Sequence, residues 1–136
     1  MNLENTQRII STCPSLFATD SSNPIFFGFE CGDGWANLLV ELCAKINLRL
    51  QQFPKNIAEE FVVLQVKEKY GKLRFYMSYA DDIIDSYIKD AEQQSSVTCE
   101  TCGKSGKLRG TMWLYVACDS HTLDVDLNPP DENDLP

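Results

Sequence analysis

The stretch that decides the fold is FVVLQVKEKYGKLRFYMSY, residues 61–79. Its first half is rich in β-branched and aromatic residues, and its second half alternates apolar with polar residues. Between the halves, Tyr70-Gly71-Lys72 supplies a short turn. The stretch therefore predicts a β-hairpin. One face of its second strand carries Leu73, Phe75, Met77 and Tyr79.

Two amphipathic helices flank the hairpin. In the first, predicted over residues 35–53, apolar residues recur at three- and four-residue intervals until Pro54 ends the helix. These residues are Trp35, Leu38, Leu39, Leu42, Ile46 and Leu50. The second helix is predicted over residues 82–95, with Asp81 or Asp82 as its N-cap. Its inward residues are Ile84, Tyr87, Ile88 and Ala91.

Weaker patterns fill the rest of the first hundred residues. We expect a short helix over residues 2–12, a loop over 21–24, a strand or packed segment over 25–29 and one helical turn over 57–60. Together these elements predict a small α+β domain. Its helices pack on the apolar face of the hairpin or of a small antiparallel sheet.

Four residues near the C-terminus have the spacing of metal ligands. Cys99 and Cys102 form one Cys-x-x-Cys pair, and Cys118 and His121 form a matching pair after a gap of fifteen residues. Two such pairs can complete a tetrahedral shell around zinc. His121 is the single histidine of the chain. We favour a structural Zn²⁺ site, carried by a zinc-ribbon or treble-clef-like hairpin, over two unrelated thiol pairs.

Charge and cysteine usage indicate a cytoplasmic protein. The net charge is −8, and no stretch approaches the length of a membrane span. No apolar signal core is present near the N-terminus. After three cysteines are assigned to the metal, Cys13, Cys31 and Cys43 remain, which argues against a secreted disulfide framework. The tail, residues 124–136, carries five acidic residues and no lysine or arginine, so we expect it to be flexible.

Three sequence blocks resemble an uncharacterised family of small proteins encoded by phages and prophages. The blocks are Glu-Cys-Gly-Asp-Gly-Trp at 30–35, Lys-Glu-Lys-Tyr-Gly-Lys-Leu-Arg-Phe at 67–75, and Cys-x-x-Cys-Gly with the later Cys-x-x-His. The resemblance covers about residues 27–121. It implies a phage or mobile-element origin and a bacterial host cytoplasm, and it supplies no catalytic residue.

The first of these blocks allows a functional reading and a structural one. Glu30 and Asp33 lie in a glycine-rich turn, where carboxylates can hold a cation or transfer protons. The structural reading makes Asp33 the N-cap of the following helix and Trp35 a core anchor. We favour the structural reading, because turn and capping chemistry already account for these residue types.

Two basic clusters suggest contacts to nucleic acid or to a partner. The first comprises Lys67, Lys69, Lys72 and Arg74 on the hairpin, and the second comprises Lys104, Lys107 and Arg109 on the zinc segment. Tyr70 and Tyr76 add aromatic surface on which bases can stack. The alternative is an ordinary solvated face, which we favour. The acidic tail likewise serves solubility or imitates a phosphate backbone.

One enzymatic pattern is weaker. Asp33 with Gln65-Val66-Lys67 loosely matches the metal and lysine arrangement of some nucleases, but a second acidic ligand is missing. No serine or cysteine has a free histidine base.

We therefore expect an α+β core over 1–96, a zinc hairpin over 97–123 and an acidic tail over 124–136. The leading function is binding to a host or phage protein, such as a component of a defence system that it inhibits or modulates. The alternatives are a zinc-dependent nucleic-acid-binding module and, less favoured, a metal-dependent nuclease.

Overall fold

The computed structural model describes residues 1–17 and 28–127. Its central sheet has the strand order β1-β2-β3, formed by β1 (Phe29–Glu30), β2 (Val63–Lys69) and β3 (Lys72–Met77). β2 and β3 pair antiparallel and confirm the predicted hairpin. Its turn residues, Tyr70 and Gly71, both have positive φ, at 54° and 78°. This left-handed backbone is why glycine is suited to the turn.

β1 makes the sheet mixed rather than purely antiparallel. It pairs with β2 in parallel, with Phe29 opposite Val66 and Glu30 opposite Lys67. Two parallel strands need a long crossover, and α2 (Ala36–Leu50) lies in that connection. The predicted segment 25–29 is thus a strand at Phe29, while residues 25–27 and the loop predicted at 21–24 lie outside the described residues.

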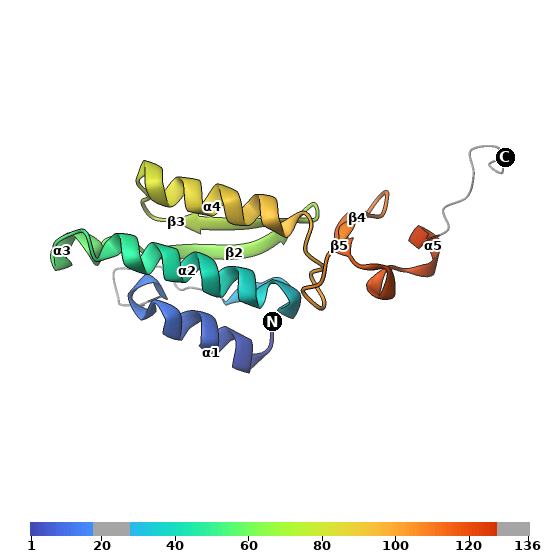
Figure 1. The fold of residues 1–136 in the computed structure, drawn as a ribbon, viewed down its shortest axis with the longest axis horizontal. Coiled ribbons are helices and arrows are strands. Elements are labelled where there is room, and N and C mark those ends of the chain that lie inside the picture. The colour runs from blue at the N-terminus through green and yellow to red at the C-terminus, as the bar shows by residue number, and fades with distance from the viewer. Residues whose placement is uncertain (18–27, 128–136) are drawn as a thin grey trace.

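Three long helices complete the core: α1 (Leu3–Thr12), α2 and α4 (Asp82–Ser95). α2 lies between α1 and α4, and α4 runs along β3 (Figure 1). The predicted helices at 2–12 and 82–95 are confirmed, and Asp81 is the N-cap of α4. α2 ends at Leu50, earlier than the predicted residue 53, because a turn already leads into Pro54. The extra helical turn, predicted over 57–60, is α3 (Lys55–Ala58) and begins two residues earlier.

The buried core joins these elements into one cluster. Its largest fully buried side chains include Trp35, Leu39, Ile46, Phe61, Leu73 and Ile84. The apolar positions predicted for the first helix are all buried. On β3, Leu73 and Phe75 are buried, but the strand stops at Met77, so Tyr79 is exposed instead of continuing the inner face.

α4 also protects the outer edge of the sheet. The backbone N–H of Leu73 donates to Ser95 Oγ at 3.0 Å, and that of Phe75 donates to Glu92 Oε2 at 3.4 Å. Unpaired N–H groups on an edge strand would otherwise be open to another chain.

The segment predicted as a zinc hairpin, residues 97–123, forms a second, two-stranded sheet from β4 (Lys107–Arg109) and β5 (Tyr115–Ala117). The predicted hairpin is present and turns at Gly110, whose φ is 88°. The second strand begins at Tyr115, however, so Met112 and Trp113 lie in the connecting bend. η3 (Asp119–His121) follows, and α5 (Asp124–Leu127) makes the start of the predicted flexible tail, 124–136, helical. The rest of that tail, 128–136, lies outside the described residues.

The three remaining cysteines belong to the core. Cys13, Cys31 and Cys43 are buried and free of disulfides. Burial raises the pKa of Cys31 to about 12, and burial also raises the pKa of Cys43. Both thiols are therefore protonated at neutral pH and pack as small apolar groups.

Candidate metal centre

Two backbone turns bring the four predicted ligands together. Cys99 and Cys102 lie in a turn after α4, where the N–H of Gly103 donates to the carbonyl of Cys99 at 2.9 Å. Cys118 is the N-cap of η3 and His121 is its last residue, and the N–H of His121 donates to the carbonyl of Cys118 at 3.1 Å. The two turns are tied together because the N–H of Glu100 donates to the carbonyl of Val116 at 3.0 Å.

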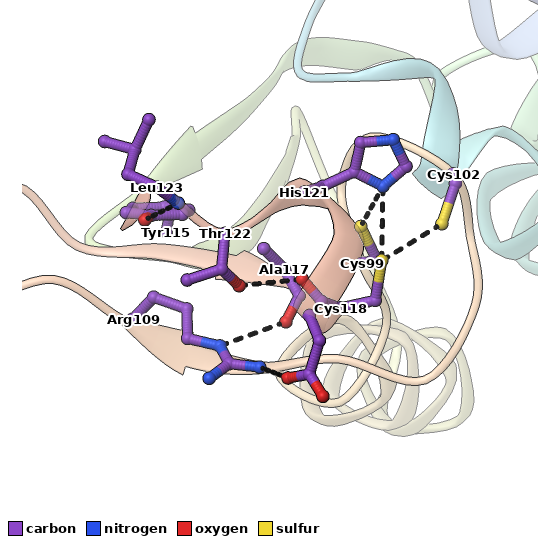
Figure 2. Close-up of polar contacts among 10 residues, drawn as sticks. Cys99, Cys102, Arg109, Tyr115, Ala117, Cys118, His121, Thr122 and Leu123 are labelled. Atoms are coloured by element: carbon purple, nitrogen blue, oxygen red, sulfur yellow. Dashed lines mark hydrogen bonds and ion pairs between the residues drawn. The ribbon is translucent and has the colours of Figure 1, made fainter. Parts of the chain in front are cut away.

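The ligand atoms converge on one point. All four lie within 4.8 Å of one another. His121 Nδ1 is 3.2 Å from Cys118 Sγ and 3.7 Å from Cys99 Sγ, and the sulfurs of Cys102 and Cys118 are 3.7 Å apart (Figure 2). Zn–S bonds of about 2.3 Å in a tetrahedron place two sulfurs about 3.8 Å apart. The cluster therefore has the dimensions of a tetrahedral metal shell.

The backbone around Cys99 favours a thiolate. Burial alone would raise the pKa of its thiol, but the N–H groups of Cys118, Cys102 and Thr101 point at the sulfur and lower the pKa to about 6. A thiolate is the form of cysteine that binds metals.

Arg109 braces the second turn of the centre. Its guanidinium donates to Asp119 Oδ1 at 2.6 Å and to the carbonyl of Ala117 at 3.3 Å (Figure 2). The Arg109 side chain is only 13% exposed. Arg109, predicted as a contact to nucleic acid or a partner, is thus engaged beside the metal ligands, whereas Lys104 and Lys107 are exposed.

The Glu30–Trp35 block packs against the turn that carries Cys99 and Cys102, which we call the cysteine turn. The N–H of Gly34 donates to the carbonyl of Glu100 at 2.7 Å, and Trp35 Nε1 donates to the carbonyl of Thr98 at 2.9 Å. Gly32 N–H donates to Glu100 Oε2 at 2.8 Å. A Cβ on Gly34 would lie 2.2 Å from the carbonyl oxygen of Cys99, so only glycine fits there. The Glu30–Trp35 block and the cysteine turn are therefore packed directly against each other, and we call this contact the joint.

Asp33 does not cap the following helix. Trp35 occupies the N-cap position of α2 and makes no side-chain capping bond, so the predicted role is wrong. Asp33 Oδ1 instead accepts from the backbone N–H of Asn2 at 2.8 Å and from Asn5 Nδ2 at 3.1 Å. The bond from Asn2 is the main reason that the pKa of Asp33 is lowered. The carboxylate ties the start of α1 to the glycine turn.

The nuclease pattern is not assembled as predicted. β1 places Glu30, rather than Asp33, opposite Lys67, and Gln65 Nε2 donates to Glu30 Oε1 at 3.4 Å. Within residues 1–17 and 28–127, the Cys–His cluster is the single group of three or more potential metal ligands. Asp33 and Glu30 therefore belong to no group of three or more potential ligands there, such as the nuclease pattern would need.

The first basic cluster occupies one face of the sheet. Lys67 pairs with Arg74 and Lys69 pairs with Lys72, on the face opposite the buried Val66. We call these four residues the basic sheet face. Arg74 Nη1 lies 4.0 Å from Glu92 Oε1, and Lys69 Nζ lies over the ring of Tyr70. Like charges directly opposite one another destabilise a sheet, and Glu30, which lies opposite Lys67 on β1, offsets part of this repulsion.

A cavity of about 550 Å³ lies beside the metal centre, and sequence reasoning did not find it. Trp113, Tyr115 and Leu123 line it, together with Glu68 from the end of β2 and Glu100 from the cysteine turn. We call it the Trp113 cavity. The one local signal was the pair Met112-Trp113 just after Gly110, where large apolar residues follow a turn and are left exposed.

No known protein family, curated protein or solved structure matches this chain. Among the helices of the described residues, none is long and apolar enough to cross a membrane.

Proposed function

We propose that Cys99, Cys102, Cys118 and His121 hold a Zn²⁺ ion with a structural role. Three thiolates and one imidazole are a donor set typical of zinc. Four protein ligands fill a tetrahedral shell and leave no position for a water or a substrate. The convergence of the four ligand atoms within 4.8 Å is the observation that carries this proposal.

Metal analysis of the purified protein tests the zinc site. We expect one zinc per chain, which Cys102→Ser lowers strongly. Cys31→Ala is the matched control, because it removes a cysteine outside the cluster and leaves the zinc content unchanged. A wild-type protein that is folded and free of zinc after purification from zinc-containing medium would reject the site.

We further propose that the protein is a small phage or prophage accessory protein. In this proposal it acts in the cytoplasm of the bacterial host by binding a host or phage protein, such as a component of a defence system. The resemblance of its three sequence blocks supports the origin. The Trp113 cavity supports the mode of action, because Trp113 is 77% exposed and Met112 is fully exposed beside it. Tryptophan and methionine are enriched at protein interfaces.

A pull-down from bacterial lysate with the tagged full chain tests this function. We expect one protein to be retained at near-stoichiometric level after nuclease treatment. Trp113→Ala should abolish the capture, whereas Leu48→Ala, which removes an exposed leucine from α2, should not. Capture that both variants retain would place the interface elsewhere. Capture that vanishes with nuclease would favour the second candidate.

That second candidate is nucleic-acid binding through the basic sheet face. Its support is the cross-strand pairing of four cationic side chains, with Tyr76 exposed on the next pair. Binding to labelled DNA or RNA should weaken steeply between about 50 and 200 mM salt. The double variant Lys67→Glu, Lys69→Glu should lose binding, and Lys55→Glu on α3 should keep it. No binding at low salt would remove this candidate.

A further inference from the structure

We propose that the Trp113 cavity receives a lysine or arginine side chain from an apolar segment of the partner protein. This inference rests on the proposed protein-binding function and names the chemistry that the partner presents. The cavity volume, about 550 Å³, lies in the range of small-ligand pockets and exceeds one long side chain.

The first argument is charge. Glu68, Glu100 and Asp126 line the cavity from three separate segments, and none of its described lining residues is a lysine or arginine. Acidic residues in the lining of a cavity favour a cation there, and the net charge of −8 steers cationic partners toward the molecule.

The second argument is that these carboxylates are held in place. Glu68 Oε1 accepts from the N–H of Gly71 at 2.6 Å, and Glu100 Oε2 accepts from the N–H of Gly32. Asp126 Oδ2 accepts from the hydroxyl of Tyr115. In the described part of the chain, no hydrogen bond engages the second oxygen of any of the three. Each carboxylate is thus oriented in advance and keeps an acceptor for an incoming cation.

The third argument is the aromatic and apolar character of the site. Trp113 and Tyr115 are aromatic residues of the cavity lining, and an arginine stacks on aromatic rings as well as pairing with carboxylates. Leu123 and Val125 add exposed apolar surface at the edge of the cavity. A partner segment that fits both features carries a cationic side chain flanked by apolar ones.

Two synthetic peptides test this chemistry on the zinc-loaded full chain. The first is acetyl-Gly-Leu-Arg-Phe-Arg-Leu-Gly-amide, and the second replaces both arginines with citrulline, which keeps the shape and removes the charge. Tryptophan fluorescence reads the binding, because Trp35 is buried and Trp113 is exposed. We expect the arginine peptide to bind at least tenfold more tightly than the citrulline peptide.

Matched variants locate the site. Glu68→Gln keeps the acceptor for Gly71 and removes a charge, and we expect it to weaken the arginine peptide at least threefold. Trp113→Ala removes the fluorescent reporter, so its peptide binding is measured by a backbone amide NMR titration. We expect this variant to bind no peptide. Glu41→Gln, an exposed carboxylate on α2 outside the cavity, should change nothing. Melting temperatures within experimental error of wild type show that each variant is folded.

Four results would overturn the inference. The first two are equal affinity for the two peptides and no saturable binding of either peptide. The third is peptide binding that is unchanged in both Trp113→Ala and Glu68→Gln. The fourth is a concentration-dependent dimer of the wild type that Trp113→Ala converts to monomer. The last would make a second copy the occupant. If lysate capture depends on Trp113 while Glu68→Gln and Asp126→Asn leave it intact, the protein-binding function stands and the cationic partner fails. If neither capture nor peptide binding occurs, both fail.

Discussion

At the residue scale, the Glu30–Trp35 block holds the cysteine turn mainly through its backbone and through the indole of Trp35. Gly34 and Trp35 donate to two carbonyls of the Thr98–Glu100 stretch, and no carboxylate of the block takes part in those two bonds. Glycine and tryptophan are therefore required there for opposite reasons. Gly34 leaves room for the cysteine turn, whereas Trp35 fills the core and donates a hydrogen bond to a buried carbonyl.

Gly34→Ala should destabilise the protein. The added methyl would lie 2.2 Å from the carbonyl oxygen of Cys99, which belongs to backbone that cannot move without disturbing the ligand turn. We expect a loss of about 1–3 kcal/mol, as for overpacking elsewhere, and faster release of zinc to a chelator. Gly28→Ala is the control, because its Cβ would meet nothing within 4 Å and only its positive φ is strained. Equal zinc release from both variants would contradict the shared joint.

Trp35→Phe isolates the indole bond. The phenyl ring preserves most of the burial but leaves the carbonyl of Thr98 without its donor. Urea unfolding should show a loss of at least about 1–3 kcal/mol, the cost of an unsatisfied buried acceptor. Trp113→Phe, at an exposed indole, should stay within about 0.5 kcal/mol of wild type. A Trp35→Phe protein as stable as wild type would mean that the carbonyl finds another partner.

Sequence reasoning was strongest where chemistry is local. The spacing of two cysteine-containing pairs was enough to identify Cys99, Cys102, Cys118 and His121 as one cluster. It failed at Asp33, because a short 3₁₀ turn places Trp35 at the helix start and turns the carboxylate toward Asn2. A capping preference describes the residue type, whereas the tertiary partner decides its use.

At the element scale, an ion pair joins α2 to the start of α4. Arg49 Nε donates to Asp81 Oδ2 at 2.9 Å, while Asp81 Oδ1 caps α4 by accepting from the N–H of Ile84. Burial acts to raise the pKa of Asp81, but these bonds outweigh it and the pKa is lowered. The folded state therefore favours the ionised carboxylate.

This lowered pKa fixes the sign of a pH dependence. The contribution of Asp81 is present above its unfolded pKa of about 3.9 and is lost as the pH falls through the lower folded pKa. Asp81→Asn keeps a capping oxygen and removes the charge, so it should be less stable than wild type by at most about 1 kcal/mol at pH 7. The difference should shrink below about pH 4, as read by urea unfolding across that range. A difference that is constant with pH would reject the ion pair as its cause.

Elements were predictable where periodicity is long and regular. α2, α4 and the β2–β3 hairpin follow from apolar spacing. The pairing of β1 with β2 did not, because a two-residue strand has no period and its partner is supplied by a distant segment. The Trp113 cavity escaped prediction for the same reason. Its walls come from residues 68, 100, 113 and 126, which only the fold brings together.

At the scale of the whole molecule, the two sheets differ in what holds them. The apolar core cluster runs from Ile9 to Ile88 and includes no residue of the segment 97–123, which carries the proposed zinc ligands. In the described part of that segment, the buried residues are few: Thr98, Cys99, Val116, Ala117 and Thr122. So small a cluster cannot offset the chain entropy of some thirty residues, so the proposed metal would be the principal source of order there.

Removal of the metal should therefore unfold residues 97–127 and leave the apolar core folded. Zinc binding supplies on the order of 10 kcal/mol of folding free energy in small units. After chelation, hydrogen exchange should lose protection over residues 97–127 and keep it in α2, β2 and α4. Cys99→Ser should give the same pattern without a chelator. In both cases protection in α1 tests the Asp33 contact, because that contact depends on the glycine turn that rests on the metal segment.

The opposite result would be equally informative about the architecture. If chelation exposes α2 and β2 together with the zinc segment, the joint at Gly34 and Trp35 couples the two parts into one cooperative unit. The apolar core would then be insufficient on its own, despite its size. The Trp113 cavity spans both parts, because Glu68 belongs to the core hairpin and Glu100 to the cysteine turn. Under either outcome, loss of zinc should abolish binding of the arginine peptide by separating these two carboxylates.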